Sequence, residues 1–310
     1  MIKGRIDFSV ELGKLKLKNP VMPSSGTFGY GVEFADFLNL SDLGAIVVKG
    51  TTLHPRLGNF QRRFTEIAGS AEISTIGLQN VGVERFVKDK LPLLRKFEAP
   101  VIVNIAGESV EEFVQITEVL NRADGVGGIE VNLACPNVQG GGLQFSADRE
   151  ATSQVVKAVR NATDLPIIAK LCPTITDVSI LAKVCEEAGA DALCPIFAVM
   201  GMTIDILTRK SKLGKNILAS VGGPWMKPIA LKLAWQAARA VKIPIIGGGG
   251  ITCAEDAIEF FIAGATAVQI GIYNFVDPRV MIRIIEGIKT FFADNRLERM
   301  TDLVGTMKTS

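Results

Sequence analysis

Histidine is almost absent from this sequence, with a single residue, His54, among 310. Cysteine is sparse as well, and no two cysteines have the C-x-x-C spacing that is typical of metal and redox sites. A Cys/His metal centre is therefore not expected, and we take His54 as a surface residue rather than a catalytic base. The odd cysteine number favours reduced thiols and a cytoplasmic protein. The five cysteines are Cys135, Cys172, Cys185, Cys194 and Cys253.

Long apolar runs without charge are also missing. The first seven residues contain no apolar core of the kind found in a signal peptide. The most apolar long window, 188–207, carries Asp191, Asp205 and a proline, which does not suit a membrane span. We therefore expect neither a signal peptide nor a membrane-spanning segment.

The chain has no excess of one charge. Its 34 basic and 32 acidic residues give a net charge of +2, and no basic run is interleaved with aromatic residues. This excludes a general attraction to nucleic acid, so a nucleic-acid partner is not expected. The 48% hydrophobic content indicates a globular protein with a large core.

Short apolar segments alternate with segments of helical periodicity along most of the chain. Before them, residues 6–18 alternate by twos around Gly13 and predict a β-hairpin. The predicted strands are 21–23, 45–49, 101–105, 129–133, 167–171, 192–197, 245–247 and 267–270. The predicted helices are 33–40, 83–97, 109–121, 148–162, 177–188, 227–241, 254–264 and 278–292.

Eight strand–helix units without a break in composition predict one (β/α)₈ barrel, a TIM barrel, as a single domain over residues 1–310. A doubly wound open sheet is the alternative, and it would carry a glycine fingerprint in its first strand–helix turn. The segment 24–29 does not match such a fingerprint. The barrel is therefore favoured.

Unusual polar residues collect at the predicted carboxyl ends of the strands, where barrel enzymes carry their active sites. Lys49, Asn104, Asn132 and Lys170 close four successive strands. Two connections on this face are long, 50–82 and 198–226, and long ordered loops there usually cover a substrate. The sequence therefore predicts a ligand pocket at this end of the barrel.

Glycine is concentrated after the last two predicted strands, at 247–250 and at Gly271. Backbone N–H groups in such turns can bind a phosphate, although glycine-rich turns are common in this fold. Lys49 and Lys170 point toward the same mouth, where a phosphate or an electron-rich ring could compensate their charge. Alternatively, each lysine is ion-paired or reaches solvent.

Cys135 follows the strand 128–133 and stands between Asn132 and Asn137. Pro136 ends the strand because it has no N–H to donate. A thiol at such a strand end can act as an acid or a base, and the two amides could hold a planar polar ring. A small apolar residue at a strand end is the plainer interpretation. The flanking asparagines favour the catalytic one.

The chain resembles the class 1 dihydroorotate dehydrogenases over nearly its whole length, and in particular the class 1B catalytic subunit. The motifs that carry the resemblance are Asn19-Pro20-Val21, Ser25-Gly26-Thr27-Phe28-Gly29, Lys49-Gly50-Thr51-Thr52, Ile76-Gly77-Leu78-Gln79-Asn80, Asn132-Leu133-Ala134-Cys135-Pro136-Asn137, Lys227-Pro228-Ile229-Ala230-Leu231, the glycine run 247–250 and Asn274-Phe275-Val276-Asp277-Pro278.

The resemblance implies FMN at the barrel mouth and a reaction in two parts. Cys135 would remove a proton next to the ring carbonyl of dihydroorotate, and a hydride would pass to flavin N5, giving orotate. Class 2 enzymes instead use a serine and carry an N-terminal membrane segment. The residues implied for the cofactor are Ser25, Lys49, Gly50, Asn104, Asn132, Lys170, Ile196, Gly223, Gly249, Gly250, Gly271 and Ile272.

The substrate half departs from the family pattern, in which four asparagines hold the pyrimidine. Ser74 and Phe197 stand where two of them are expected, and Cys172-Pro173-Thr174 replaces a Thr-Pro-Asn pattern. Each lost hydrogen-bond partner of a buried polar ring costs about 1–3 kcal/mol. The residues implied for the substrate are Lys49, Ser74, Ile76, Gly77, Leu78, Asn132, Asn137, Phe197 and Ala198.

Three functions remain open at this point. The first is oxidation of dihydroorotate, and the second keeps flavin and base but acts on a less polar, dihydropyrimidine-like compound. The third is a non-catalytic flavoprotein subunit, which the intact Cys135 and Lys49 disfavour. Membership of class 1B further implies an FAD/iron–sulfur electron-transfer subunit and a homodimer or heterotetramer.

Overall fold

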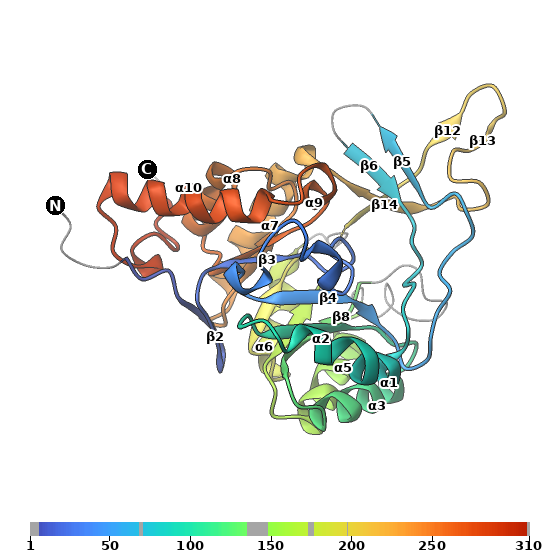
Figure 1. Cartoon of the computed structure of the whole chain (residues 1–310), viewed down its shortest axis with the longest axis horizontal. Coiled ribbons are helices and arrows are strands. Elements are labelled where there is room, and N and C mark those ends of the chain that lie inside the picture. Colours follow the sequence, from blue (N-terminus) through green and yellow to red (C-terminus); the bar gives the residue numbers. More distant parts are fainter. Residues whose placement is uncertain (1–5, 68–70, 135–147, 173–176, 197, 309–310) are drawn as a thin grey trace.

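The structure is a computed structural model, and it describes residues 6–67, 71–134, 148–172, 177–196 and 198–308. Within these residues eight parallel strands form the barrel (Figure 1). In chain order they are β3 (Val21–Pro23), β4 (Ile46–Thr51), β7 (Val101–Ile105), β8 (Val126–Asn132), β9 (Ile167–Lys170), β10 (Ala192–Cys194), β15 (Ile246–Gly248) and β16 (Ala267–Ile270).

The strands close on themselves in two runs, β4-β7-β8-β9-β10 and β15-β16-β3. A parallel bridge between Leu193 and Ile245 joins the runs on one side. On the other side the Gly44 N–H donates to the Val21 carbonyl at 2.8 Å. The predicted (β/α)₈ barrel is therefore confirmed.

The barrel strands form where the sequence has short apolar runs, because both strand faces are covered. All five residues of β7 are buried, and so are all four of β9. The helices cover the outside of the barrel with their apolar faces. They are α3 (Val110–Asn121), α5 (Arg149–Ala162), α6 (Val178–Glu187), α7 (Lys227–Ala240), α8 (Ala254–Ala263) and α10 (Val280–Asn295).

Helix starts follow side-chain caps that the sequence supplies. Ser109 accepts from the Glu112 N–H at the start of α3, and Asp148 accepts from the Ala151 N–H at the start of α5. Asp177 does the same for α6. These caps explain why the predicted helix boundaries lie within a few residues of the observed ones.

The predicted N-terminal hairpin is present as β1 (Val10–Leu12) and β2 (Leu15–Leu17), which pair antiparallel. Gly13 turns the chain with a φ of 59°, and a Cβ at this position would lie 2.6 Å from the Asp191 Cβ. Only glycine fits this turn. The inward residues of the hairpin are buried against the main core.

A second, antiparallel sheet lies beyond one end of the barrel (Figure 1). Its strand order is β11 (Val199–Gly201), β14 (Ala219–Gly222), β6 (Ala71–Ser74) and β5 (Phe64–Ile67). A small hairpin, β12 (Ile204–Asp205) and β13 (Lys210–Ser211), extends from it. The connections 50–82 and 198–226, predicted as long loops, are thus folded together into one sheet.

Some predicted elements are wrong or interrupted. The helix predicted over 33–40 is absent, and two 3₁₀ turns, η1 (Val32–Phe34) and η2 (Leu40–Asp42), take its place. Asn39 explains the break, since its side chain accepts from the Ser41 N–H and starts a new turn. The helix predicted over 83–97 is split into α1 (Val83–Arg85), the π-helical η3 (Phe86–Lys90) and α2 (Leu91–Leu94), where Pro92 has no N–H to donate.

The strand predicted over 192–197 already ends at Cys194, before Pro195. Three short elements were not predicted: η4 (Pro224–Met226), α9 (Tyr273–Val276) and η5 (Met300–Asp302). In the described part of the chain, no helix is both long and apolar enough to cross a membrane.

Candidate active site

One pocket opens at the carboxyl ends of the barrel strands, beneath the antiparallel sheet. It brings together most of the residues that the sequence singled out, from both the strand ends and the two long connections. From the predicted cofactor set it contains Ser25, Lys49, Gly50, Asn104, Asn132, Ile196, Gly223, Gly249, Gly250, Gly271 and Ile272. From the predicted substrate set it adds Ser74, Ile76, Gly77, Leu78 and Ala198.

Three predicted residues, Cys135, Asn137 and Phe197, lie outside the described residues. The chain immediately before Cys135 is described. There, the Asn132 side-chain oxygen accepts from the Ala134 N–H at 3.1 Å, and both residues are buried. This bond fixes the end of β8 beside the pocket.

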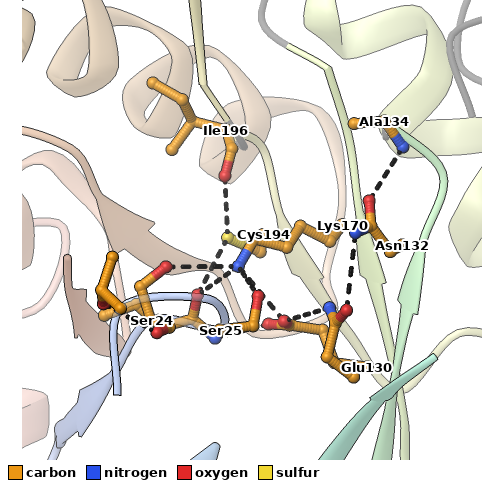
Figure 2. A network of polar contacts seen from close by, with 11 residues as sticks. Ser24, Ser25, Glu130, Asn132, Ala134, Lys170, Cys194 and Ile196 are labelled. Carbon is orange, nitrogen blue, oxygen red and sulfur yellow. Dashed lines mark hydrogen bonds and ion pairs between the residues drawn. The ribbon is translucent and has the colours of Figure 1, made fainter. Parts of the chain in front are cut away.

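Lys170 lies beneath the pocket in a buried polar network inside the barrel (Figure 2). Its ammonium donates to the Glu130 carboxylate at 3.1 Å, to the Gln269 side-chain oxygen at 2.8 Å and to the Ser25 hydroxyl at 3.1 Å. The Lys170 and Glu130 side chains are 2% and 0% exposed, respectively. Of the two sequence interpretations of Lys170, the structure therefore supports the ion pair.

Glu130 is the centre of this network, and the sequence analysis missed its role. Its carboxylate accepts from the Asn104 amide at 2.7 Å and from the Gln269 amide at 2.5 Å, in addition to Lys170. The Asn132 amide in turn donates to the Asn104 oxygen at 3.4 Å. A glutamate inside a strand that is buried on both faces was the available signal, because such a charge needs a partner.

Cys194 also contacts this network and keeps its proton. Its thiol lies 3.3 Å from the Ile196 carbonyl and 3.8 Å from the Gln269 oxygen. Burial raises the pKa of the Cys194 thiol to about 11, although Lys170 nearby lowers it. Since a thiol is nucleophilic or basic only as the thiolate, Cys194 is not a candidate base near neutral pH.

Lys49 presents a second cation to the pocket. It has no ion pair within 4 Å among the described residues, and its ammonium lies 5.7 Å from the centre of the Tyr30 ring. Burial lowers the pKa of Lys49, with an opposing effect from Glu33 and a further lowering by Arg63. An anionic or electron-rich group in the pocket would compensate this ammonium.

The glycine turn after β15 has room only for glycine. Gly249 and Gly250 have positive φ angles of 98° and 75°, and a Cβ at Gly250 would lie 2.5 Å from the Lys227 backbone nitrogen. A Cβ at Gly271, by contrast, would meet only the Ser24 Cβ, at 3.8 Å. The two turns thus form a backbone-lined recess at one end of the pocket, which suits a phosphate.

Glu72, on β6, is a buried carboxyl group in the pocket wall itself, and the sequence analysis missed it too. It is 3% exposed, and its Oε1 accepts from the Ser74 hydroxyl at 3.2 Å. Its Oε2 has no hydrogen-bond partner among the described residues. Burial raises the pKa of Glu72 to about 7, and the Ser74 hydrogen bond opposes this shift.

No cluster of three or more potential metal ligands occurs in the part of the chain that the structure describes. The pocket instead offers a backbone recess for an anion, a half-buried lysine, amide side chains and apolar walls. These groups fit a ligand that combines a phosphate with a planar polar ring. The fold and the pocket are those of a TIM-barrel enzyme with its active site at the carboxyl ends of the strands.

The family model described as "Dihydroorotate dehydrogenase" matches residues 8–292. The chain belongs to the dihydroorotate dehydrogenase family, whose members are flavin-dependent oxidoreductases.

Two bacterial relatives, both named dihydroorotate dehydrogenase B (NAD(+)) catalytic subunit, show how far the similarity extends. The protein of Geotalea uraniireducens is 47% identical over 306 residues, which cover 99% of this chain and 100% of that protein. The protein of a Thermoanaerobacter species is 47% identical over 303 residues, 98% of this chain and 99% of its own.

A solved structure has the same fold. It is dihydroorotate dehydrogenase from Eimeria tenella in complex with ferulenol, and it superposes with a TM-score of 0.82 at 18% sequence identity. The superposition covers 99% of this chain and 90% of that one. The likeness extends through the barrel and the sheet above it.

Proposed function

We propose that this chain is an FMN-dependent dehydrogenase that oxidises dihydroorotate to orotate, with Cys135 as the base. The observation that carries the proposal is the pocket itself, where the Lys170–Glu130 network and the glycine recess meet at one end of the barrel. The relatives' names add the substrate.

Different described residues would bind the phosphate and the ring of FMN. The phosphate would bind the recess of Gly249, Gly250, Gly271 and the Ile272 backbone. The ring would lie toward the buried network, with Ser25, Lys49, Gly50, Asn104, Asn132, Lys170, Ile196 and Gly223 around it. When bound, FMN supplies the acceptor for the hydride.

Lys170 holds a fixed positive charge at the base of the site. Glu130 and Gln269 orient its ammonium. Its contacts to the Ser24 and Ser25 hydroxyls are on the side of the pocket, which both serines line. A preorganised cation favours negative charge that develops on a neighbouring ring, because it needs no reorganisation during the reaction. Asn104 and Asn132 supply amide groups at the same edge.

Cys135 would accept the proton from the substrate carbon. A free thiol has a pKa of about 8.5, so a modest favourable environment makes part of it thiolate near neutral pH. The Asn132–Ala134 hydrogen bond holds the chain just before it. Asn137 would bind the substrate ring from the same segment.

A second function, oxidation or reduction of a less polar dihydropyrimidine-like substrate, is favoured by one observation. The Ser74 hydroxyl, which stands where the family has an amide, already donates to Glu72. Together with Phe197, this changes the groups offered to a substrate. The third possibility, a non-catalytic flavoprotein subunit, has no such support.

We further propose one FMN-binding domain over residues 1–310, a cytoplasmic location, and assembly as a homodimer or a heterotetramer. The words "catalytic subunit" in the relatives' names support a partner that passes on electrons. An FAD/iron–sulfur subunit would suit that role.

Anaerobic mixing of the FMN-loaded protein with dihydroorotate in a stopped-flow spectrometer tests the function. We expect rapid loss of oxidised flavin absorbance, with orotate formed in equal amount. A flavin that dihydroorotate leaves oxidised, while a dihydropyrimidine without the carboxylate reduces it, would favour the second function. A folded protein that takes up no FMN would refute the proposal.

A further inference from the structure

A carboxyl group with a free oxygen faces the pocket from the antiparallel sheet. Glu72 is only 3% exposed and lines the pocket, and its Oε2 has no hydrogen-bond partner among the residues that the structure describes. A buried polar atom without a partner is destabilising, so a buried oxygen of this kind normally has a ligand or water as its partner. The position therefore calls for a hydrogen-bonding group in the bound molecule.

Glu72 and Ser74 act from the same face of β6, because residues two apart in a strand point to the same side. The intervening residue, Ile73, points the other way and packs with Leu213 and Ala219 in a small separate core. That core fixes the strand behind the pair. The Ser74 hydroxyl donates a hydrogen bond to Oε1 of Glu72, so Oε2 is the oxygen that remains for a ligand among the described residues.

Burial, rather than a neighbouring charge, favours the neutral form of Glu72. Glu66 of β5 stands opposite it across the strand pair and is exposed, and β14 contributes no titratable group. Lys49, Cys194 and Tyr273 line the same pocket, but no ion pair joins Glu72 to a cation among the described residues. An unpaired carboxylate at this burial is costly, and protonation removes that cost.

We propose that neutral Glu72 is the specificity-determining residue of the substrate site and holds a cyclic amide edge of the substrate. A carboxylic acid carries one O–H donor and one carbonyl acceptor side by side. A ring –CO–NH– group offers the complementary acceptor and donor, so the two can exchange a pair of hydrogen bonds. The Glu72–Ser74 pair would thus replace the amide that the family resemblance places at position 74.

This inference rests on the proposed function, because it assigns the substrate class of the same pocket. It favours lactams and imides, which include the dihydropyrimidines, over open-chain acids. It also predicts a direction for pH dependence: ligand affinity falls as pH rises through about 7, where Glu72 loses its proton.

The test measures ligand binding to the oxidised, FMN-loaded protein through the change in flavin absorbance, at pH 6 and pH 8. Orotate and uracil carry the cyclic amide, and 1,3-dimethyluracil is the matched ligand without either N–H. We expect 1,3-dimethyluracil to bind at least tenfold more weakly than uracil at pH 6. For the unmodified protein, we expect orotate and uracil to bind more weakly at pH 8.

The variants separate recognition from folding. Glu72→Ala should weaken uracil and orotate binding at least tenfold at pH 6. Glu72→Gln, whose amide also donates and accepts, should bind within about threefold of the unmodified protein and lose the difference between the two pH values. Glu187→Gln, at the exposed end of α6 and outside the pocket lining, is the control and should change neither. Thermal unfolding and flavin content are recorded for each protein.

Several results would overturn the inference. These are unchanged ligand affinity in Glu72→Ala, tighter binding at pH 8, no binding of orotate or uracil to the unmodified protein, or loss of FMN instead of ligand in the alanine variant. Failure of the proposed function looks different: dihydroorotate would not reduce the flavin, while uracil would still bind in a Glu72-dependent manner.

Discussion

Breaking the buried ion pair inside the barrel should strongly destabilise the protein. Glu130→Gln keeps the shape of the side chain, but it removes the charge that faces Lys170 at 3.1 Å. Its NH2 group also replaces one of the two oxygens that accept from the Asn104 and Gln269 amides, so one of these hydrogen bonds is lost. Removing one partner of a buried pair costs about 3–5 kcal/mol, because the other charge is left uncompensated. The neutral oxygens of Gln269 and Ser25 still accept from Lys170, so we expect about 3 kcal/mol.

The assay is urea unfolding of the FMN-loaded protein, followed by flavin fluorescence and by circular dichroism. Asp89→Asn is the control, since it removes an ion pair of the same kind at 3.2 Å whose side chains are 70% and 41% exposed. Such exposed pairs contribute about 0–1 kcal/mol. A double variant with Lys170→Met should lose less than the sum of the two single variants. If the free energy of unfolding falls no more in Glu130→Gln than in the control, the buried ion pair does not stabilise the protein as argued.

Three further outcomes are expected. Cys135→Ala should keep its flavin and lose nearly all turnover near neutral pH, whereas Cys135→Ser should recover some activity at high pH. Cys253→Ala is the control. Unchanged turnover in Cys135→Ala would contradict the role of Cys135 as the base. Gly250→Ala should bind FMN at least tenfold more weakly in an equilibrium titration, because its Cβ would collide with the Lys227 backbone. Gly305→Ala is the control, because Gly305 has a similar φ of 74° but open space around it, and this variant should bind FMN normally. Equal FMN affinity in both variants would refute the role of the glycine recess in phosphate binding. The pKa of Glu72 is raised in the folded state from 4.5 to about 7, so the folded protein binds this proton more tightly than the unfolded chain does. Protonated Glu72 therefore contributes fully to the folding stability below about pH 4.5, and this contribution is lost as the pH rises to about 7. Urea unfolding should therefore show Glu72→Gln gaining stability relative to the unmodified protein between pH 5 and pH 8, and a constant difference would contradict the shift.

The parts of the fold that could be predicted are those that the local sequence determines. The strands β3, β7 and β16 were predicted with their observed bounds, since each is a short apolar run between turns. The antiparallel sheet was not predicted, because β6 pairs with β14 across about 150 residues and neither strand is strongly apolar. No local sequence pattern in 50–82 or 198–226 predicts that these two strands pair.

The sequence singled out many residues that line the pocket, but not the contacts between them. Lys170, Asn104 and Asn132 were recognised as polar residues at strand ends, yet Glu130 and Gln269, which organise them, lie on strands far apart in sequence. Glu72 was missed for another reason. A comparison with a family motif draws attention to the position that differs, Ser74, and not to the residue two before it on the same strand face.

The buried glutamate beneath the pocket and the one that lines it show that partners, rather than burial alone, decide what a carboxyl group does. Glu130 and Glu72 are 0% and 3% exposed, so desolvation penalises the charged form of both. Glu130 meets an ammonium and two amides, which pair its charge and make it a fixed part of the barrel. Glu72 meets only one hydroxyl among the described residues, which leaves its Oε2 available to a ligand. In the function proposed here, the barrel end would bind the cofactor and the overlying sheet would bind the substrate, so a change of two residues on the sheet could alter the substrate without disturbing the flavin site.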